Sequence, residues 1–531
     1  MGKFFCLNRF YIPLRTPFLT NDVRNGITEL CLLELNKHAL KFMQKEVRII
    51  DMGPANKTAS MQSEFSLKKI LPVLLAVTSG MFLIILDSTI MNVAVPKLVS
   101  AFDTNLSTIQ WVITAYTLSL SAVIPLAGWF SDRFSSKRMF MTSIVLFVLA
   151  SVLCALAQTP EQLIIFRILQ GLGGGMVAPI GIATVFSVSP PDKRGSVMGI
   201  LGIPMLLAPI LGPVLSGWLI EFINWHWIFF INVPVGFIAL LMAWRYLPTA
   251  KPKHNSKLDV VGAILAPISF ASLVFAVHQA GEKGWSNAWT LGSLIFGIVM
   301  LTIFIWHELQ QKYPLLELRV FRSPAFVHGI LVAWLNQIAL FGSILLFPLY
   351  LQQVKGLSPL EAGLYVIPQA ILSTVGINLG GKLFDRYGVR PVAIMGILSL
   401  SGSLLALTQV TANTSPLYIM CSFAFAGLGQ GLTMMQINTH VLKSAPKELV
   451  SRVTPITTSA QQIMSSFGVT ITMAFLAENI RELPSQHTLN QLGHAFGSTF
   501  WITLGFAIVA LVLSLFFAKR IENKNASPQS K

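Results

Sequence analysis

The chain has 531 residues, of which 53% are hydrophobic and only 11% are charged. A soluble domain carries roughly 25% charged residues, so this composition excludes a soluble globular protein and indicates many membrane-spanning segments. The formal net charge of +16 does not indicate nucleic-acid binding, because the charges lie in short connections between apolar runs. The four cysteines show neither metal-ligand nor paired spacing, and no metal site is expected.

Residues 1–60 differ from the rest of the chain, since they mix charges with scattered apolar residues and contain no long apolar run. They therefore resemble neither a signal peptide nor a spanning helix. We expect a poorly ordered cytoplasmic extension, or a segment that results from a start codon placed too early. Met52 and Met61 are the alternative starts, and truncation to either one is expected to leave activity and abundance unchanged.

From Leu71 onward, apolar runs long enough to cross a bilayer recur about fourteen times. The predicted helices lie at 71–94, 109–130, 139–158, 162–187, 196–220, 225–247, 259–280, 288–306, 326–350, 360–383, 392–410, 416–442, 453–477 and 497–518.

Basic residues concentrate in alternate connections between these helices. One set of connections holds most of them, whereas the other set holds only Lys97, Lys283, Lys355 and Arg481. Because cytoplasmic loops carry the excess of Lys and Arg, the imbalance predicts a multi-pass protein of the cell membrane with both termini in the cytoplasm.

The sequence repeats itself once. Gly128–Arg133 and Gly381–Arg386 both read G-x-[LF]-x-D-R and follow the second and tenth predicted helices, in cytoplasmic turns. Gly171–Gly175 in the fourth helix matches Gly427–Gly431 in the twelfth. Similar spacing in the same membrane orientation implies two six-helix halves related by an axis along the membrane normal.

The seventh and eighth predicted helices lack these motifs and are interpreted as an insertion between the halves. The predicted division of the chain is an extension at 1–60, a first six-helix bundle at 61–247, an inserted helix pair at 258–306, a second six-helix bundle at 325–518 and a cytoplasmic tail at 519–531.

Three polar residues within apolar runs are candidates for function. Arg167 lies in the fourth predicted helix, with Gln170 three residues on, and Asp87 is the clearest acidic residue in any predicted span. Charges at membrane depth are costly and mark functional sites by default. A carboxyl removed from water can bind a proton near neutral pH, and a bound cation would expel that proton. The alternatives are a snorkelling Arg167, and an Asp87 held by Thr89, Asn92 or another helix for folding alone.

The two halves differ at this position, because Phe423 stands in the second half where Arg167 stands in the first. A charged relay is therefore expected in the first half. The fifth predicted helix contains Gly212, Pro213 and Gly217, and a proline there frees a backbone carbonyl and bends a helix. Together with the glycines of the fourth helix, this pattern predicts a moving helix pair that lines a cavity, with a static kink as the alternative.

Four stretches of the first half match signatures of one family. L-D-x-T-I-x-N-x-A-x-P is complete at Leu86–Pro96, and R-x-x-Q-G lies at Arg167–Gly171. The antiporter signature of the fifth helix, G-P-x-x-G-G, is found at Gly212–Gly217 with Ser216 in place of one glycine. Residues 225–236 resemble the start of the sixth helix in the same family.

A further signature, G-x-L-x-D-R-x-G-R-K, occurs at Gly128–Lys137 with three departures, and Gly381–Arg390 is a closer copy. The departures are Phe130, Ser135 and Ser136. In their order and spacing these motifs resemble the major facilitator superfamily, and within it the fourteen-helix drug:proton antiporters of the EmrB/QacA type. The resemblance covers about 71–518 and implies an all-α integral membrane protein with the major facilitator fold.

The resemblance also implies roles for the two D-R motifs. Asp132 and Arg133, with Asp385 and Arg386 as the second-half counterparts, would form a cytoplasmic gate. In the family, the aspartate lies near the positive N-terminal end of a helix from the opposite bundle, and charge pairs lock the outward-open state. The alternative is a solvated charged turn that only sets the topology.

The resemblance implies a proton-driven efflux antiporter for amphipathic drugs. The chain contains no G-x-x-x-x-G-K-[ST] motif, so the proton gradient rather than a nucleotide or other cofactor is the expected energy source. An exporter of an endogenous lipid, peptide or metabolite is the first alternative. A membrane-embedded enzyme would need a His, Asp or Glu cluster at a membrane face, and a sensor would need a soluble output domain. If the host has an outer membrane, a periplasmic adaptor is a further candidate partner.

Overall fold

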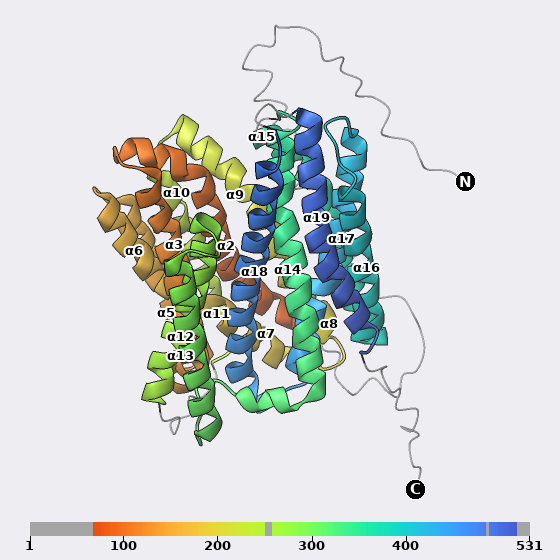
Figure 1. Cartoon of the computed structure of the whole chain (residues 1–531). Coiled ribbons are helices and arrows are strands. Elements are labelled where there is room, and N and C mark those ends of the chain that lie inside the picture. Colours follow the sequence, from red (N-terminus) through yellow and green to blue (C-terminus); the bar gives the residue numbers. More distant parts are fainter. Residues whose placement is uncertain (1–66, 250–257, 358, 485–487, 518–531) are drawn as a thin grey trace. The chain divides into compact units, whose positions relative to one another are not determined.

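The computed structural model of the chain describes residues 67–249, 258–357, 359–484 and 488–517 (Figure 1). The extension expected at 1–60 and the tail expected at 519–531 lie outside these residues. Every regular element in the described ranges is a helix, and thirteen of these helices are long and apolar enough to cross a membrane. The protein is therefore an all-α, multi-pass membrane protein, as its composition predicts.

The helices of the first half follow the expected runs, but several runs are divided into two helices. They are α2 (Leu67–Ala101), α3 (Leu106–Val123), η1 (Ile124–Leu126), α4 (Ala127–Phe134), α5 (Ser136–Ala155), α6 (Pro160–Gly174), α7 (Val177–Val188), α8 (Arg194–Ile200), α9 (Gly202–Phe222), α10 (Trp227–Phe230) and α11 (Asn232–Tyr246).

The fifth expected span, 196–220, corresponds to α8 and α9. The predicted bend at Pro213 is not where the helix is interrupted, because α9 continues through Gly212 and Pro213 and the interruption lies at Leu201. The 21 residues of α9 correspond to about 30 Å at about 1.5 Å per residue, which is the thickness of a bilayer core.

The inserted pair and the second half follow in order. Their helices are α12 (Val260–Lys283), α13 (Ala288–Gln310), η2 (Leu318–Arg322), α14 (Pro324–Gln353), α15 (Pro359–Tyr387), α16 (Val389–Leu407), α17 (Pro416–Lys443), η3 (Lys447–Leu449), α18 (Val450–Arg481) and α19 (Leu489–Ser514).

The two D-R motifs lie in helices rather than in the turns predicted from the sequence. Gly128–Arg133 belongs to α4, and Gly381–Arg386 belongs to α15. The chain turns just after each motif, at Ser135 with φ 78° and at Gly388 with φ 84°. These two residues occupy the same position of the repeated signature, so in both halves a residue with positive φ follows the motif.

Close helix packing brings the first-half helices together. A β-carbon added at Gly171 of α6 would lie 2.6 Å from the carbonyl oxygen of Tyr116 in α3, and one at Gly173 would lie 2.6 Å from the backbone nitrogen of Phe147 in α5. Glycine is therefore required at these crossings, because no larger residue would fit. The predicted glycine-packed face of the fourth helix holds α6 tightly between α3 and α5.

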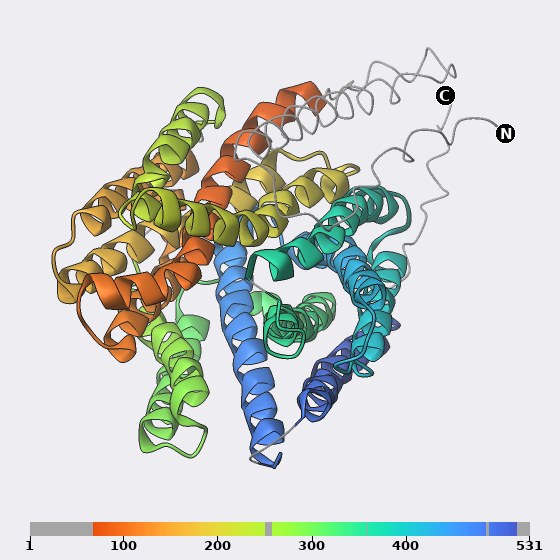
Figure 2. The ribbon, with the colours of Figure 1, turned by 90° about the horizontal axis from the view of Figure 1, so that it is seen from above.

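Within the unit Ser66–Lys531, the two halves meet at corresponding helices (Figure 2). α15 packs against α8 and α9, and α18 packs against α4, α7 and η1. A β-carbon at Gly128 would lie 2.5 Å from the carbonyl oxygen of Ser451, and one at Gly381 would lie 2.7 Å from Cα of Ser196. The inserted helix α12 packs against α3 of the first half and α18 of the second, so the pair touches both halves.

Candidate functional site: a buried ion pair and two interhelical clamps

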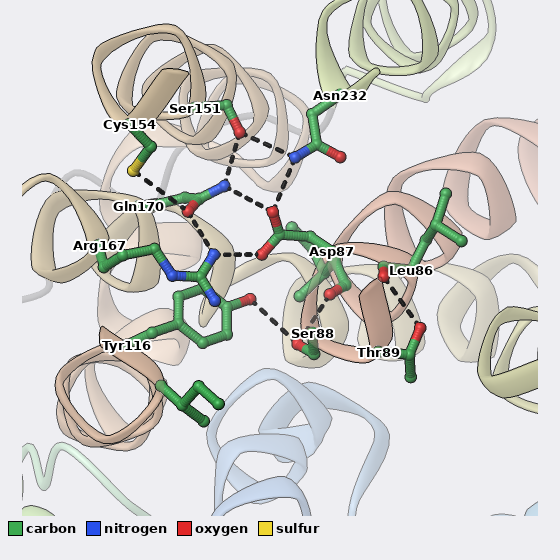
Figure 3. Close-up of polar contacts among 12 residues, drawn as sticks. Leu86, Asp87, Ser88, Thr89, Tyr116, Ser151, Cys154, Arg167, Gln170 and Asn232 are labelled. Atoms are coloured by element: carbon green, nitrogen blue, oxygen red, sulfur yellow. Dashed lines mark hydrogen bonds and ion pairs between the residues drawn. The ribbon is translucent and has the colours of Figure 1, made fainter. Parts of the chain in front are cut away.

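An ion pair lies in the interior of the first half. Nη1 of Arg167 in α6 donates to Oδ2 of Asp87 in α2 at 2.6 Å (Figure 3). Arg167 is 0% exposed and Asp87 is 2% exposed. The pair joins residues eighty positions apart, because α6 and α2 are both packed into the same bundle. The two charges thus compensate each other in a place from which water is excluded.

Neutral side chains complete the environment of the Asp87 carboxyl. Oδ1 accepts hydrogen bonds from Nε2 of Gln170 at 2.9 Å and from Nδ2 of Asn232 at 2.7 Å. The same two nitrogens donate to Oγ of Ser151, at 2.6 and 2.9 Å. Arg167 and Gln170 are three residues apart, so they lie on one face of α6, and Nη1 of Arg167 donates to Oε1 of Gln170 at 2.6 Å.

Aromatic rings and two unsatisfied atoms surround this network. Cζ of Arg167 lies 4.1 Å from the ring centroid of Tyr116, a cation–π contact, and 5.8 Å from that of Phe229. Among the described residues, Nε of Arg167 and Oδ1 of Asn232 are buried without a hydrogen-bond partner. The site therefore keeps one unused donor and one unused acceptor beside the ion pair, which is costly unless they are used in another state.

The three sequence-predicted residues Asp87, Arg167 and Gln170 come together in one network. The snorkelling alternative for Arg167 is wrong, because its side chain is fully buried and directed at Asp87. Thr89 does not hold Asp87, since its hydroxyl is within hydrogen-bonding distance of the carbonyl oxygens of Leu86 and Ala208. The side chain of Asn92 lies outside the described part of the structure. Side chains from two other helices hold the carboxyl, namely Arg167 and Gln170 of α6 and Asn232 of α11.

Sequence reasoning missed Asn232, Ser151 and Tyr116 as site residues. Asn232 lies in the Trp-rich stretch at 225–236, where an amide inside an apolar run was an available signal. Ser151 offered none, because serines are common in membrane helices and usually donate to their own helix. At the equivalent second-half position, Phe423 stacks on Phe347, so a pair of aromatic rings replaces the charges there.

The first D-R motif forms a clamp between the halves, which we call the Asp132 clamp. Oδ2 of Asp132 accepts from Nε of Arg452 at 3.2 Å, and Oδ1 accepts from Oγ of Ser451 at 3.0 Å. Nη1 of Arg452 also donates to the carbonyl oxygen of Pro314 at 2.8 Å. Asp132 is buried whereas Arg133 is exposed, and it is the aspartate that binds Arg452 and Ser451 of the other half.

The second D-R motif forms the corresponding Asp385 clamp. Oδ1 of Asp385 accepts from the backbone nitrogen of Gly195 at 2.6 Å, and Oδ2 accepts from the backbone nitrogen and Oγ of Ser196 at 2.9 and 2.6 Å. Arg386 is exposed and its Cζ lies 5.1 Å from the ring centroid of Tyr387. Both aspartates thus bind the first turn of a helix in the opposite half, which a merely solvated turn would not do.

The glycines of the fifth helix have different surroundings. A β-carbon at Gly212 would overlap the side chain of Thr89, whereas one at Gly217 would meet nothing within 4 Å. Oγ of Ser216, which replaces a family glycine, donates to the carbonyl oxygen of Ile90 at 3.0 Å. Gly212 therefore allows α9 to pack closely on α2, just beyond Asp87. The side chain of Pro213 lies outside the described part of the structure.

Comparisons with known proteins agree with this geometry. The family model of the Major Facilitator Superfamily matches residues 77–469. The MFS-type transporter YhcA of Bacillus subtilis (strain 168) is 34% identical over 408 residues, which cover 77% of each chain. The lincomycin resistance protein LmrB of Listeria monocytogenes is 30% identical over 456 residues, which cover 85% of this chain and 97% of the relative.

Among solved structures, the chain is similar in fold to the proton:xylose symporter XylE bound to 6-bromo-6-deoxy-D-glucose. The TM-score is 0.61 at 16% identity, and the match covers 86% of this chain and 97% of the other. The match of the family model to most of the chain, the shared fold and the two clamps lead to one assignment. The chain belongs to the major facilitator superfamily, a family of membrane transporters.

Proposed function

We propose that the chain is a proton-coupled antiporter that exports amphipathic drugs or toxic compounds across the cytoplasmic membrane by alternating access. The observation that carries the proposal is the buried Asp87–Arg167 ion pair with its amide partners. A carboxyl neutralised by an adjacent cation is a group at which a proton and a cationic substrate compete. The pair also rests on a helix, α2, that α9 contacts closely, so changes at Asp87 can reach a second helix.

The network can serve both protonation states of Asp87. In the ionised state, three nitrogens donate to the carboxylate. When Asp87 takes up a proton it becomes a donor, and the amide of Asn232 can turn so that Oδ1, which has no partner here, accepts from it. Arg167 is then released from its ion pair and keeps its contact with Tyr116. Uptake and release of one proton thereby change which helices are tied to α2.

The two clamps support a gate that closes one face of the transporter. Asp132 binds α18 and Asp385 binds α8, so each clamp ties one half to the other. With the connections that are rich in Lys and Arg on the cytoplasmic side, both termini are cytoplasmic and the clamped face is the inner one. The structure then corresponds to a state closed toward the cytoplasm, and export requires both clamps to open in turn.

The substrate class follows from the relatives and the charge of the site. The name of LmrB records resistance to lincomycin, and the match to that relative covers 85% of this chain. A cationic amphipathic compound would compete with Arg167 for Asp87, whereas a neutral one would not. Export of an endogenous lipid, peptide or metabolite remains the alternative substrate class. In a host with an outer membrane, a periplasmic adaptor would carry the substrate onward.

The test is drug transport by purified protein in liposomes under an imposed proton gradient. Wild type is expected to move ethidium against its gradient and to release protons when ethidium is added in detergent. Asp87→Asn is expected to lose substrate-driven proton release and ethidium transport while still inserting as a folded protein of lower stability.

The matched control is Glu161→Gln, an equal change of charge at an exposed residue in the first turn of α6. This variant should behave as wild type. Equal proton release from wild type and Asp87→Asn would remove Asp87 from the coupling mechanism. An ethidium transport rate that is the same with and without the proton gradient would contradict proton antiport itself.

A further inference from the structure

Two acidic side chains meet at the end of the inserted helix pair, far in sequence from Asp87. Asp259 caps the N-terminus of α12, where Oδ1 accepts from the backbone nitrogen of Gly262 at 3.1 Å. Glu308 lies in the last turn of α13. A β-carbon at Gly262 would overlap Oδ2 of Asp259 and would lie 2.6 Å from Oε1 of Glu308. The two carboxyl groups thus converge on one glycine, and their distances from the same β-carbon place Oδ2 of Asp259 and Oε1 of Glu308 no more than 5.0 Å apart.

Glu308 is buried, and within the described part of the chain no basic side chain forms an ion pair with it. It is 1% exposed, and Oε1 accepts from the backbone nitrogen of Leu315 at 3.2 Å. Oε2 is buried and, within the ranges that the structure describes, no donor bonds to it. Burying a carboxylate oxygen without a hydrogen-bond donor is strongly disfavoured. We therefore infer that a further group satisfies this oxygen.

Among the described residues, the basic side chain that contacts this pair lies beside Asp259. From α13, Nε2 of His307 lies 2.8 and 3.0 Å from the two carboxyl oxygens of Asp259. In η2, Nη1 of Arg319 lies 3.9 Å from Oε1 of Glu317. No group of three or more His, Cys, Asp or Glu side chains arranged for a metal ion occurs among the described residues. A proton therefore best fits the role of that further group.

We propose that Asp259 and Glu308 form a proton-binding site that holds one proton between them and controls the Asp132 clamp. Two carboxylates are acceptors only, so they can hydrogen-bond each other only when one of them carries a proton. Two carboxylates that converge on one site repel each other, so ionisation of both is disfavoured and the pair retains one proton. The proton exchanges with water through His307, whose side chain is 18% exposed and contacts Asp259.

The site is connected to the clamp through two adjacent residues. Glu308 holds the backbone nitrogen of Leu315, and the carbonyl oxygen of the preceding residue, Pro314, accepts from Nη1 of Arg452 at 2.8 Å. Nε of the same arginine donates to Asp132. When the proton leaves, the pair carries two negative charges and the carboxyl groups separate. Glu308 then displaces the segment at 314–315, and Arg452 loses one of its two fixed partners.

This connection predicts a sign for the pH response. The Asp132 clamp is stable while the pair holds its proton and weakens as the pH rises and the proton is lost. The coupling step rests on the proposed role of the clamp as a gate, whereas the proton site itself does not. The two parts are therefore tested by separate measurements on the full-length protein.

The site is tested by infrared titration of purified protein, which detects the C=O stretch of a protonated carboxyl. Glu308→Gln is expected to remove one such band that wild type shows near neutral pH. Gly262→Ala, which forces the carboxyl groups apart, should shift the pH at which that band disappears. Glu282→Gln, the same change at the other end of α12, is the control and should keep the band unaltered. A band that titrates identically in wild type and Glu308→Gln overturns the proposal.

The coupling is tested by pulsed electron paramagnetic resonance between spin labels at Phe134→Cys in α4 and Lys447→Cys in η3, two exposed positions on either side of the clamp. In wild type, the longer label distance should gain population as the pH rises. In Glu308→Gln, which has no proton to lose, the short distance should persist, while Glu282→Gln should follow wild type. An unchanged pH response in Glu308→Gln overturns the coupling. If the infrared band and the label distances respond to pH as expected but no drug is transported, the proton site and its coupling stand and only the proposed function is contradicted.

Discussion

Ser135 and Gly388 both have a positive φ, of 78° and 84°, at equivalent positions of the two repeats. Each residue ends the helix that carries a clamp aspartate and starts the next one. Glycine tolerates this conformation freely, whereas serine is strained in it. The first repeat therefore carries a local strain that the second repeat lacks.

We expect Ser135→Gly to stabilise the protein. A non-glycine residue in such a sparsely populated region costs about 1–3 kcal/mol, while replacing a serine cap by glycine costs only a few tenths of a kcal/mol. The serine cap is also weak here, because Oγ accepts from the backbone nitrogen of Arg138 at 3.5 Å. Thermal unfolding in detergent, followed by tryptophan fluorescence, should give a higher midpoint for the variant. Gly388→Ala should lower the midpoint, and the opposite order would contradict the strain argument.

The Asp87–Arg167 pair should show strong thermodynamic coupling. Removal of one partner from a buried ion pair costs about 3–5 kcal/mol, because the other charge remains buried and unpaired. We expect Asp87→Asn and Arg167→Gln each to lower the unfolding midpoint markedly, and the double variant to recover much of the loss. Proton-coupled transport should be absent in all three. The recovery distinguishes lost charge balance from lost packing.

The exposed pair Glu478–Arg481 gives the matched control for this cycle. Its atoms lie 3.5 Å apart, and the two side chains are 55% and 80% exposed. Exposed ion pairs contribute about 0–1 kcal/mol, so neutralising either residue or both should barely move the midpoint. A coupling energy at Asp87–Arg167 no larger than at this surface pair would show that the buried ion pair does not stabilise the bundle.

The membrane-spanning architecture could be predicted from the sequence, but the ends of the helices could not. Apolar runs mark what lies in lipid, and a helix can continue beyond its apolar part. The run predicted at 71–94 belongs to a helix of 35 residues, Leu67–Ala101, which carries Lys97 within it. Likewise the D-R motifs were predicted in turns because they are charged. Their helices end only where the backbone reaches positive φ, at Ser135 and Gly388.

Two charged residues of the candidate site could also be predicted from the sequence. Asp87 and Arg167 were identified separately, because an isolated charge in an apolar run is costly and conspicuous. Their pairing could not be read from the sequence, since it depends on how α2 and α6 cross. Ser151 and Asn232 are neutral, and neutral polar residues are frequent enough in membrane helices to give no distinct signal.

Gly381→Ala should open the Asp385 clamp. The added β-carbon would lie 2.7 Å from Cα of Ser196, so α15 and α8 must move apart and the bonds to Asp385 lengthen. Alkylation of a cysteine at Ile377, which is buried beside α8, should become several-fold faster with a water-soluble maleimide. Gly402→Ala is the control, because a β-carbon there meets nothing within 4 Å. Equal alkylation rates in both variants would contradict this role of Gly381.

The two clamps should respond unequally to the same substitution. Asp385 accepts hydrogen bonds from two backbone nitrogens, which can only donate. In Asp385→Asn, the amide nitrogen would face one of these donors. That backbone N–H would then have no acceptor. Such a loss costs about 1–3 kcal/mol. In Asp132→Asn, the amide oxygen can still accept from Arg452 while the amide nitrogen donates to Oγ of Ser451, because a hydroxyl is both donor and acceptor. The Asp132 clamp should therefore tolerate the change far better.

The measurement is the population of the open gate. For the Asp132 clamp it comes from the distance between spin labels at exposed positions on α4 and η3. For the Asp385 clamp it comes from the alkylation rate of a cysteine introduced at Ile377. Asp385→Asn should raise the open population about tenfold or more, which corresponds to at least about 1.4 kcal/mol. Asp132→Asn should change its own readout less than about threefold. Ser451→Ala combined with Asp132→Asn removes the hydroxyl that rescues the amide, and this double variant should open the Asp132 clamp further. Equal opening by Asp385→Asn and Asp132→Asn would show that overall charge, and not the identity of the donors, sets the strength of each clamp.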